Sequence, residues 1–141
     1  MNILVVDAQG GGIGKQVISA IKNQVPEAVI TAVGTNSVAA SAMKKAGADH
    51  AATGENAVIV ACRKADVIIG PIGIVIADSL YGEITPRMAA AIGQSSAKRI
   101  LIPINHCDNI IVGVDDLKIS RLVACVIDEI DRWLKQKHCE A

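Results

Sequence analysis

Four of the five consecutive residues 10–14 near the start of the chain are glycine, and a lysine follows them directly. Glycine adopts positive φ angles and lets a ligand approach the backbone closely. The loop comes after an apolar run and before an amphipathic stretch, which predicts free N–H groups at a helix N-terminus, a place that favours an anion. We therefore expect a phosphate-bearing small molecule to be bound by Gly10, Gly11, Gly12, Ile13, Gly14 and Lys15. A tight turn that binds nothing is the alternative interpretation.

The loop departs from the named phosphate-binding motifs. The dinucleotide pattern G-x-G-x-x-G fails because Lys15 stands at the third glycine, and the Walker pattern fails because Gln9 and Gln16 replace its first glycine and its Ser or Thr. The loop is closer to that of short-chain dehydrogenases. Their catalytic Tyr-x-x-x-Lys is absent, however, because the only tyrosine, Tyr81, is followed four positions later by Thr85. We therefore reject that activity.

The polar residues after the second apolar run bear on the identity of the ligand. An NAD site usually places an acid there for the ribose hydroxyls, whereas this chain has Thr35, Asn36 and Ser37. Hydroxyl and amide groups can bond a 2′-phosphate or a second anion. An NADP-like dinucleotide or a mononucleotide therefore fits better than NAD. An ordinary helix N-cap is the alternative role for Asn36 or Ser37.

Two further loops are expected to close the binding site, because ligands of parallel sheets bind at the carboxyl ends of the strands. The first contributes Gly70, Pro71 and Gly73, whose glycines suggest a close backbone approach to the ligand. The second contributes Asn105, at the start of the polar run 105–109.

The same loops hold the candidates for acid–base or nucleophilic chemistry. His106 is a candidate base or metal ligand and Cys107 a candidate nucleophile, although neighbours on an extended chain point in opposite directions and do not form a pair. Asp78 and Glu83 are candidate acid–base groups. Polar, solvated loops are the alternative interpretation of both stretches. We expect Asp7, at the end of the first strand, to fix the glycine loop by accepting backbone N–H bonds.

Apolar runs and helical periodicity alternate along the chain. Strands are predicted over residues 2–7, 28–34, 50–53, 66–70 and 99–105. Helices are predicted over residues 13–25, 37–47 and 56–65, after the Thr-Pro cap at 85–86, and from 115–116 to 134. Two segments stay open: 74–80 as a helical turn or an extended run, and 110–114 as a short sixth strand or an edge hairpin. The order predicts one α/β domain over residues 1–141, a Rossmann-like, doubly wound, mostly parallel sheet in three layers.

Composition narrows the classes of partner. Lys plus Arg and Asp plus Glu each number 14, so the net charge is zero, and only one Trp, one Tyr and no Phe are present. Nucleic-acid binding by a basic surface or by aromatic stacking is therefore not expected. The chain has no apolar run of membrane-spanning length and no charged leader, so we expect a cytoplasmic protein that does not bind membranes. The four cysteines match no zinc module, and no metal is predicted.

The whole chain resembles an uncharacterised bacterial family, one of the domains of unknown function. The resemblance rests on the segments 5–15, 32–36, 70–74 and 82–86, and on Leu101-Ile102-Pro103 with Asn105 and Cys107. These segments fall on the strand ends where the site is expected. Because no activity is established for that family, the resemblance implies no catalytic residues.

Three functions remain open at this point. The first is a nucleotide- or dinucleotide-binding protein, NADP-like in its preference. The second is an enzyme acting on a small phosphorylated metabolite. The third is a non-enzymatic regulatory or interaction protein, in which the apolar stripe from Ile119 to Leu134 with Trp133 forms a homodimer seam. Packing of that stripe on its own sheet is the alternative.

Overall fold

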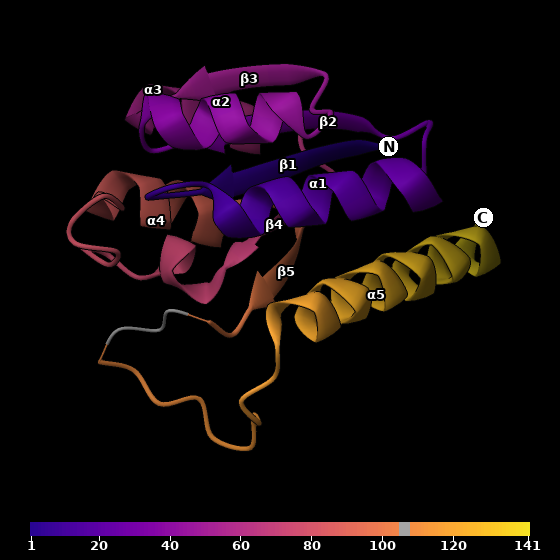
Figure 1. Ribbon diagram of the computed structural model, residues 1–141. Helices are drawn as coiled ribbons and strands as arrows, with labels where there is room; N and C mark the ends of the chain where they lie inside the picture. The colour runs from indigo at the N-terminus through magenta and orange to yellow at the C-terminus, as the bar shows by residue number, and fades with distance from the viewer. Residues whose placement is uncertain (105–107) are drawn as a thin grey trace.

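The computed structural model of the chain describes residues 1–104 and 108–141. Its strands are β1 (Asn2–Asp7), β2 (Val29–Gly34), β3 (His50–Thr53), β4 (Val67–Pro71) and β5 (Lys98–Ile102). Its helices are α1 (Gly12–Gln24), α2 (Ser37–Lys45), α3 (Glu55–Cys62), the short 3-10 helix η1 (Ile72–Val75), α4 (Pro86–Gln94) and α5 (Ile119–Glu140). The strands form a five-stranded, all-parallel sheet in the order β3-β2-β1-β4-β5. This confirms the predicted α/β class and three-layer arrangement (Figure 1).

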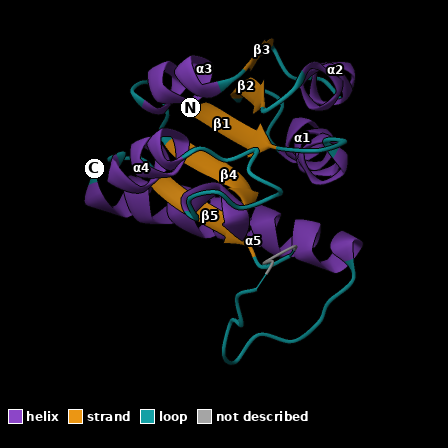
Figure 2. Cartoon of the chain, turned by 90° about the vertical axis from the view of Figure 1, so that its left-hand side faces the viewer, coloured by secondary structure: helices purple, strands orange, loops and turns teal. Residues whose placement is uncertain are grey.

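The strand order places a topological switch between β1 and β4. From β1 the chain moves outward through β2 to β3, and it then returns across the sheet to β4 and β5. The helices therefore divide between the two faces of the sheet, with α1, α2 and α5 on one and α3 and α4 on the other (Figure 2). In such sheets the loops after the two strands at the switch separate and leave a crevice. Those loops here follow Asp7 and Pro71.

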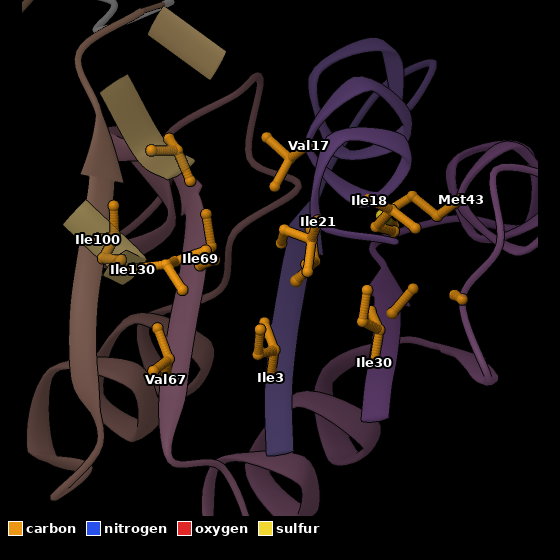
Figure 3. Packing of buried hydrophobic residues seen from close by; sticks show 14 of the residues in the cluster. Ile3, Val17, Ile18, Ile21, Ile30, Met43, Val67, Ile69, Ile100 and Ile130 are labelled. Atoms are coloured by element: carbon orange, nitrogen blue, oxygen red, sulfur yellow. The ribbon is translucent and has the colours of Figure 1, made fainter. Parts of the chain in front are cut away.

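The core has two parts because alternate residues of a strand face opposite sides of the sheet. In β1, Ile3 and Val5 face the side covered by α1 and α5, whereas Leu4 and Val6 face α3 and α4. Figure 3 shows the first part, where side chains from α1 lie against strand residues such as Ile30. Val, Ile and Leu fill these strands because both faces are covered.

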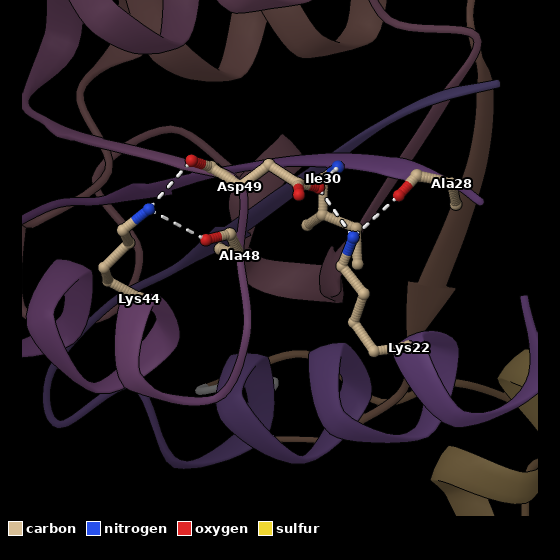
Figure 4. A network of polar contacts seen from close by, with 6 residues as sticks. All are labelled: Lys22, Ala28, Ile30, Lys44, Ala48 and Asp49. Atoms are coloured by element: carbon tan, nitrogen blue, oxygen red, sulfur yellow. Dashed lines mark hydrogen bonds and ion pairs between the residues drawn. The ribbon is translucent and has the colours of Figure 1, made fainter. Parts of the chain in front are cut away.

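A polar network ties α1 and α2 to the amino-terminal end of β2 (Figure 4). The Asp49 carboxylate accepts hydrogen bonds from the Ile30 N–H and the Lys22 ammonium, both at 2.7 Å. Lys22 also donates to the Ala28 carbonyl, and Lys44 donates to the carbonyl of Asp49. The bonds from the Ile30 N–H and the Lys22 ammonium lower the pKa of Asp49, because they favour its charged form.

The last helix begins later than the sequence predicts. It starts at Ile119, not at 115–116, so the acidic pair lies before the helix and its first turn holds no acid. Residues 112–120 are exposed, so a helical turn at 115–118 would gain no packing energy to offset the cost of ordering it. The buried stripe Leu122, Val126 and Ile130 packs in the core against its own sheet. The stripe is thus explained without a second copy, and the homodimer stays a prediction.

The two segments left open by the sequence are also resolved. No strand forms over 110–114, where Ile110 is 89% and Val112 is 92% exposed and no neighbouring strand covers them. This segment belongs to the long connection that extends away from the body between β5 and α5 (Figure 1). The other segment, residues 74–80, begins within the 3-10 helix η1. Thr85 caps α4 as predicted, with Pro86 as the first helical residue.

None of the described helices is long and apolar enough to cross a membrane.

Candidate functional site

A cavity of about 220 Å³ opens at the switch between β1 and β4. Most of its lining comes from the loop after β1 and the first turn of α1, and the rest comes from the ends of β4, the following loop and α5. The lining residues are Asp7, Ala8, Gln9, Gly10, Gly12, Ile13, Gln16, Pro71, Leu80 and Ile119. The cavity therefore lies where ligands of doubly wound sheets bind.

The glycines of this loop fall into two groups. A Cβ atom at Gly11 would lie 2.9 Å from the backbone of Ala39, and one at Gly14 would lie 2.5 Å from the Sδ atom of Met43. Gly11 also has φ +71°, and Met43 is fully buried, so a side chain at either position would force the neighbouring atoms to shift. A Cβ atom at Gly10 or Gly12 would meet nothing within 4 Å, and neither has a positive φ. These two glycines line the cavity, so protein packing does not explain them.

Asp7 holds the loop in place, as the sequence predicts. Its Oδ1 accepts the Ala8 N–H at 2.8 Å and its Oδ2 accepts the Gly14 N–H at 2.7 Å. Burial raises the pKa of Asp7, the backbone hydrogen bonds act against that rise, and the negative charge of Glu83 adds to it. The side chain is 4% exposed and lies on the floor of the cavity.

Backbone donors remain free beside this carboxylate. The Gly11 N–H donates to Ala8, and the Gln9 N–H donates to the Glu83 carboxylate. Within residues 1–104 and 108–141, the N–H groups of Gly10 and Gly12 make no hydrogen bond. Gly12 is the first residue of α1, so its N–H belongs to the positive end of the helix. Two of the residues that line the cavity, Gly10 and Gly12, therefore have N–H groups available to a ligand.

Glu83 joins three segments at the carboxyl end of β2. Its Oε1 accepts the Asn36 Nδ2–H at 2.9 Å and the Thr35 Oγ1–H at 3.2 Å, and its Oε2 accepts the Gln9 N–H at 3.0 Å. Asn36 also donates to the Gln9 carbonyl and caps α2 by accepting the Ala39 N–H. The sequence suggested Glu83 as an acid–base group but gave no sign of these partners, because they are 47 to 74 residues away.

The loop that carries Glu83 has an unusual backbone. Asp78, Leu80 and Tyr81 have φ values of 62°, 56° and 58°, in the left-handed region that side chains other than glycine rarely adopt. Gln9, on the facing loop, has φ 53°. Such conformations persist only where the surroundings hold them, and they cluster at functional sites. The Glu83 bonds are part of what holds the two loops together.

The other described residues that the sequence predicts for the binding site are not among the residues that line this cavity. Lys15 and Ser37 line a groove of about 1150 Å³ between α1, α2 and α5, so Lys15 adds no charge to the lining of the cavity. Gly70 and Gly73 are closely packed: a Cβ atom at Gly70 would meet the Val6 carbonyl and the Ile74 side chain, and one at Gly73 would meet the side chains of Ser79 and Leu80. The predicted residues at 105–107, which are Asn105, His106 and Cys107, lie outside the described part of the chain.

Asp78, the other candidate acid–base group of this loop, lies away from the cavity. Asp78 is exposed and is absent from the lining of the cavity. Its N–H donates to the Ile84 carbonyl and its carbonyl accepts the Gly82 N–H, so its backbone shapes the loop. Among the residues that the structure describes, no group of three or more His, Cys, Asp or Glu side chains is arranged to hold a metal ion.

The fold and cavity together define a Rossmann-like α/β protein with a glycine-rich loop at its switch point. The chain belongs to the family described as a domain of unknown function, DUF3842, which it matches over residues 2–135. Among curated proteins, none matches the chain.

Proposed function

We propose that this protein binds a nucleotide, with a phosphate group against the N–H groups of Gly10 and Gly12. The observation that carries the proposal is the open space at these two glycines, on the cavity side of a loop whose other glycines are needed for packing. A loop that served only as a turn would need glycine at 11 and 14 alone. Close approach of a ligand explains glycine at 10 and 12.

The charges around the cavity set the kind of anion that is expected. No Lys or Arg side chain is among the lining residues, so the attraction comes from backbone N–H groups and the α1 dipole. The Gly14 N–H already donates to Asp7, so the N–H groups of Gly10 and Gly12 are the ones left for the ligand. A phosphate ester held by two N–H groups, with the rest of the molecule on apolar Leu80 and Ile119, fits this lining.

Substitution of Gly12 by alanine tests the proposal. The new methyl group would enter the cavity without meeting protein atoms, so we expect an unchanged free energy of unfolding, or a rise of up to about 1 kcal/mol because alanine favours helix. Binding of AMP, measured by calorimetry, is expected to weaken by about tenfold or more, a loss of about 1.4 kcal/mol.

Gly93→Ala is the matched control for this experiment. Gly93 is an exposed glycine near the end of α4 whose Cβ would also meet nothing within 4 Å, and it lies outside the cavity. This variant is expected to bind AMP like the wild type. The proposal is overturned if the wild type binds none of AMP, NADP⁺ and inorganic phosphate at millimolar concentration, or if Gly12→Ala binds as well as the wild type.

A further inference from the structure

We infer that Glu83 closes the β2 side of the crevice and restricts the ligand to a mononucleotide or a smaller phosphate ester. The inference deepens the proposed function and rests on it. We call the Glu83 carboxylate, with its partners Gln9, Thr35 and Asn36, the Glu83 clamp. The clamp stands where the second half of a dinucleotide would lie.

The position of the clamp follows from the sheet. In doubly wound folds a dinucleotide lies across the carboxyl ends of the strands, with its pyrophosphate at the first helix and one ribose at the end of the second strand. Here Asp7 and Gly34 are paired in register at the ends of β1 and β2, and the Thr35 N–H donates to the Asp7 carbonyl. The clamp joins Gln9, two residues after the end of β1, to Thr35 and Asn36, the first two residues after β2.

The clamp also removes the groups that would hold a second phosphate. The Thr35 hydroxyl and the Asn36 amide both donate to Glu83, and the Asn36 carbonyl oxygen accepts from α2. Thr35 and Asn36 are two of the three side chains from which the sequence predicts an NADP-like ligand, and the third, Ser37, lines the groove between α1, α2 and α5. In the folded protein the donors of Thr35 and Asn36 are used, and a carboxylate lies beside them to repel a 2′-phosphate.

The size of the cavity agrees with a small ligand. Its volume of about 220 Å³ is below the roughly 300–1,000 Å³ of typical small-molecule sites. Thr35, Asn36 and Glu83 are absent from its lining, so the cavity ends at Gln9 on the β2 side. Room for a longer ligand would need the Glu83 loop to move.

Two substitutions at Glu83 test the inference by calorimetry with AMP and NADP⁺ as probes. Glu83→Gln removes the charge and one of the two acceptor oxygens at nearly unchanged size, and Glu83→Ala removes every bond to the Glu83 carboxylate. We expect the wild type to bind AMP at least tenfold more tightly than NADP⁺. Both variants are expected to bind NADP⁺ at least tenfold more tightly than the wild type, with AMP affinity changed by less than about threefold. The charge-matched control is Glu27→Gln. Glu27 is an exposed acid just before the amino-terminal end of β2, opposite the strand ends that hold the clamp, and its substitution is expected to change neither affinity.

Hydrogen exchange separates failure of the clamp from failure of the proposed function. In Glu83→Ala, exchange at the Gln9 and Ile84 amides is expected to accelerate at least tenfold, because both belong to the loops that the clamp joins. Unchanged exchange overturns the clamp. Tighter wild-type binding of NADP⁺ than of AMP, weakened by Glu83→Gln, overturns the size restriction and makes Glu83 a ribose acceptor. Absence of binding of every probe by the wild type, with accelerated exchange in the variant, overturns the proposed function and with it the ligand restriction.

Discussion

The glycines of the loop after β1 are present for different physical reasons. Gly14 allows α1 to approach Met43 and Asp7, whereas Gly10 and Gly12 face open space. Type and spacing predicted the loop and the role of Asp7 in fixing it. They did not separate the packing glycines from the cavity glycines, because that distinction depends on what α2 brings to the loop from more than 20 residues away.

Asp7 is expected to make stability depend on pH. Burial raises its pKa in the folded state above the ordinary aspartate value of 3.8, so below that value both folded and unfolded chains hold the proton. As pH rises from 3.8 through the folded pKa, the unfolded chain loses the proton first, and the free energy of unfolding falls. Above the folded pKa the cost of the buried charge is fully present.

Asp7→Asn isolates this contribution. Both oxygens of the Asp7 carboxyl can accept the Ala8 and Gly14 N–H groups even when it is protonated, whereas the amide NH2 of asparagine can only donate. The variant is therefore expected to lose about 1–3 kcal/mol of stability at low pH. Because asparagine does not titrate, the gap between variant and wild type should narrow as pH rises above 3.8. Urea unfolding of both proteins from pH 3.5 to 7.5 measures the gap, and a gap that is constant or widens with pH contradicts the assignment.

At the scale of elements, helices and strands with strong local patterns could be predicted from the sequence, whereas features that depend on long-range contacts could not. The strand β1, the start of α1 and the Thr-Pro cap of α4 follow from alternation, periodicity and capping. The start of α5 and the absence of a strand over 110–114 depend on which segments find a surface to pack on. The cavity was expected from strand order, but the Glu83 bonds to the β2 loop depend on a tertiary approach that no spacing shows.

Asp49 joins α1 to β2, and its substitution tests that link. The pKa of Asp49 is lowered in the folded state, so its contribution to stability is present above the ordinary aspartate value of 3.8 and is lost as pH falls through the folded pKa. We expect Asp49→Asn to lower the thermal midpoint at pH 7, and the difference from wild type to shrink in acid. Calorimetric scans at pH 7 and pH 3 provide the measurement. Asp131→Asn, at an exposed acid of α5, should leave the midpoint unchanged at both, and an Asp49 variant that matches it would refute the link.

The three described cysteines report on the whole molecule. Cys62, the last residue of α3, is buried in the core and burial raises its pKa, whereas Cys125 and Cys139 are exposed on α5. A thiol reagent is expected to modify Cys125 and Cys139 in the native protein, and Cys62 only when the chain opens. Peptide mass mapping of a labelling time course measures this order.

Ligand binding should slow that labelling. A ligand that binds only the folded protein, at 100 times its Kd, stabilises it by about 2.7 kcal/mol, so labelling of Cys62 is expected to slow by about 100-fold with AMP. Labelling of Cys125 and Cys139 serves as the internal control, because both are already exposed. Rapid native labelling of Cys62 would contradict its placement in the core.

The scarcity of aromatic residues has an optical consequence. The chain has a single tyrosine and a single tryptophan, and they belong to different parts of the molecule. Tyr81 is 96% exposed on the Glu83 loop, whereas Trp133 packs partly against the core from α5, with the Lys137 ammonium 4.4 Å from its ring. Emission excited selectively at tryptophan therefore follows the docking of α5. The tyrosine signal follows the loop beside the cavity. The native sequence thus provides two separate fluorescent reporters without any added label.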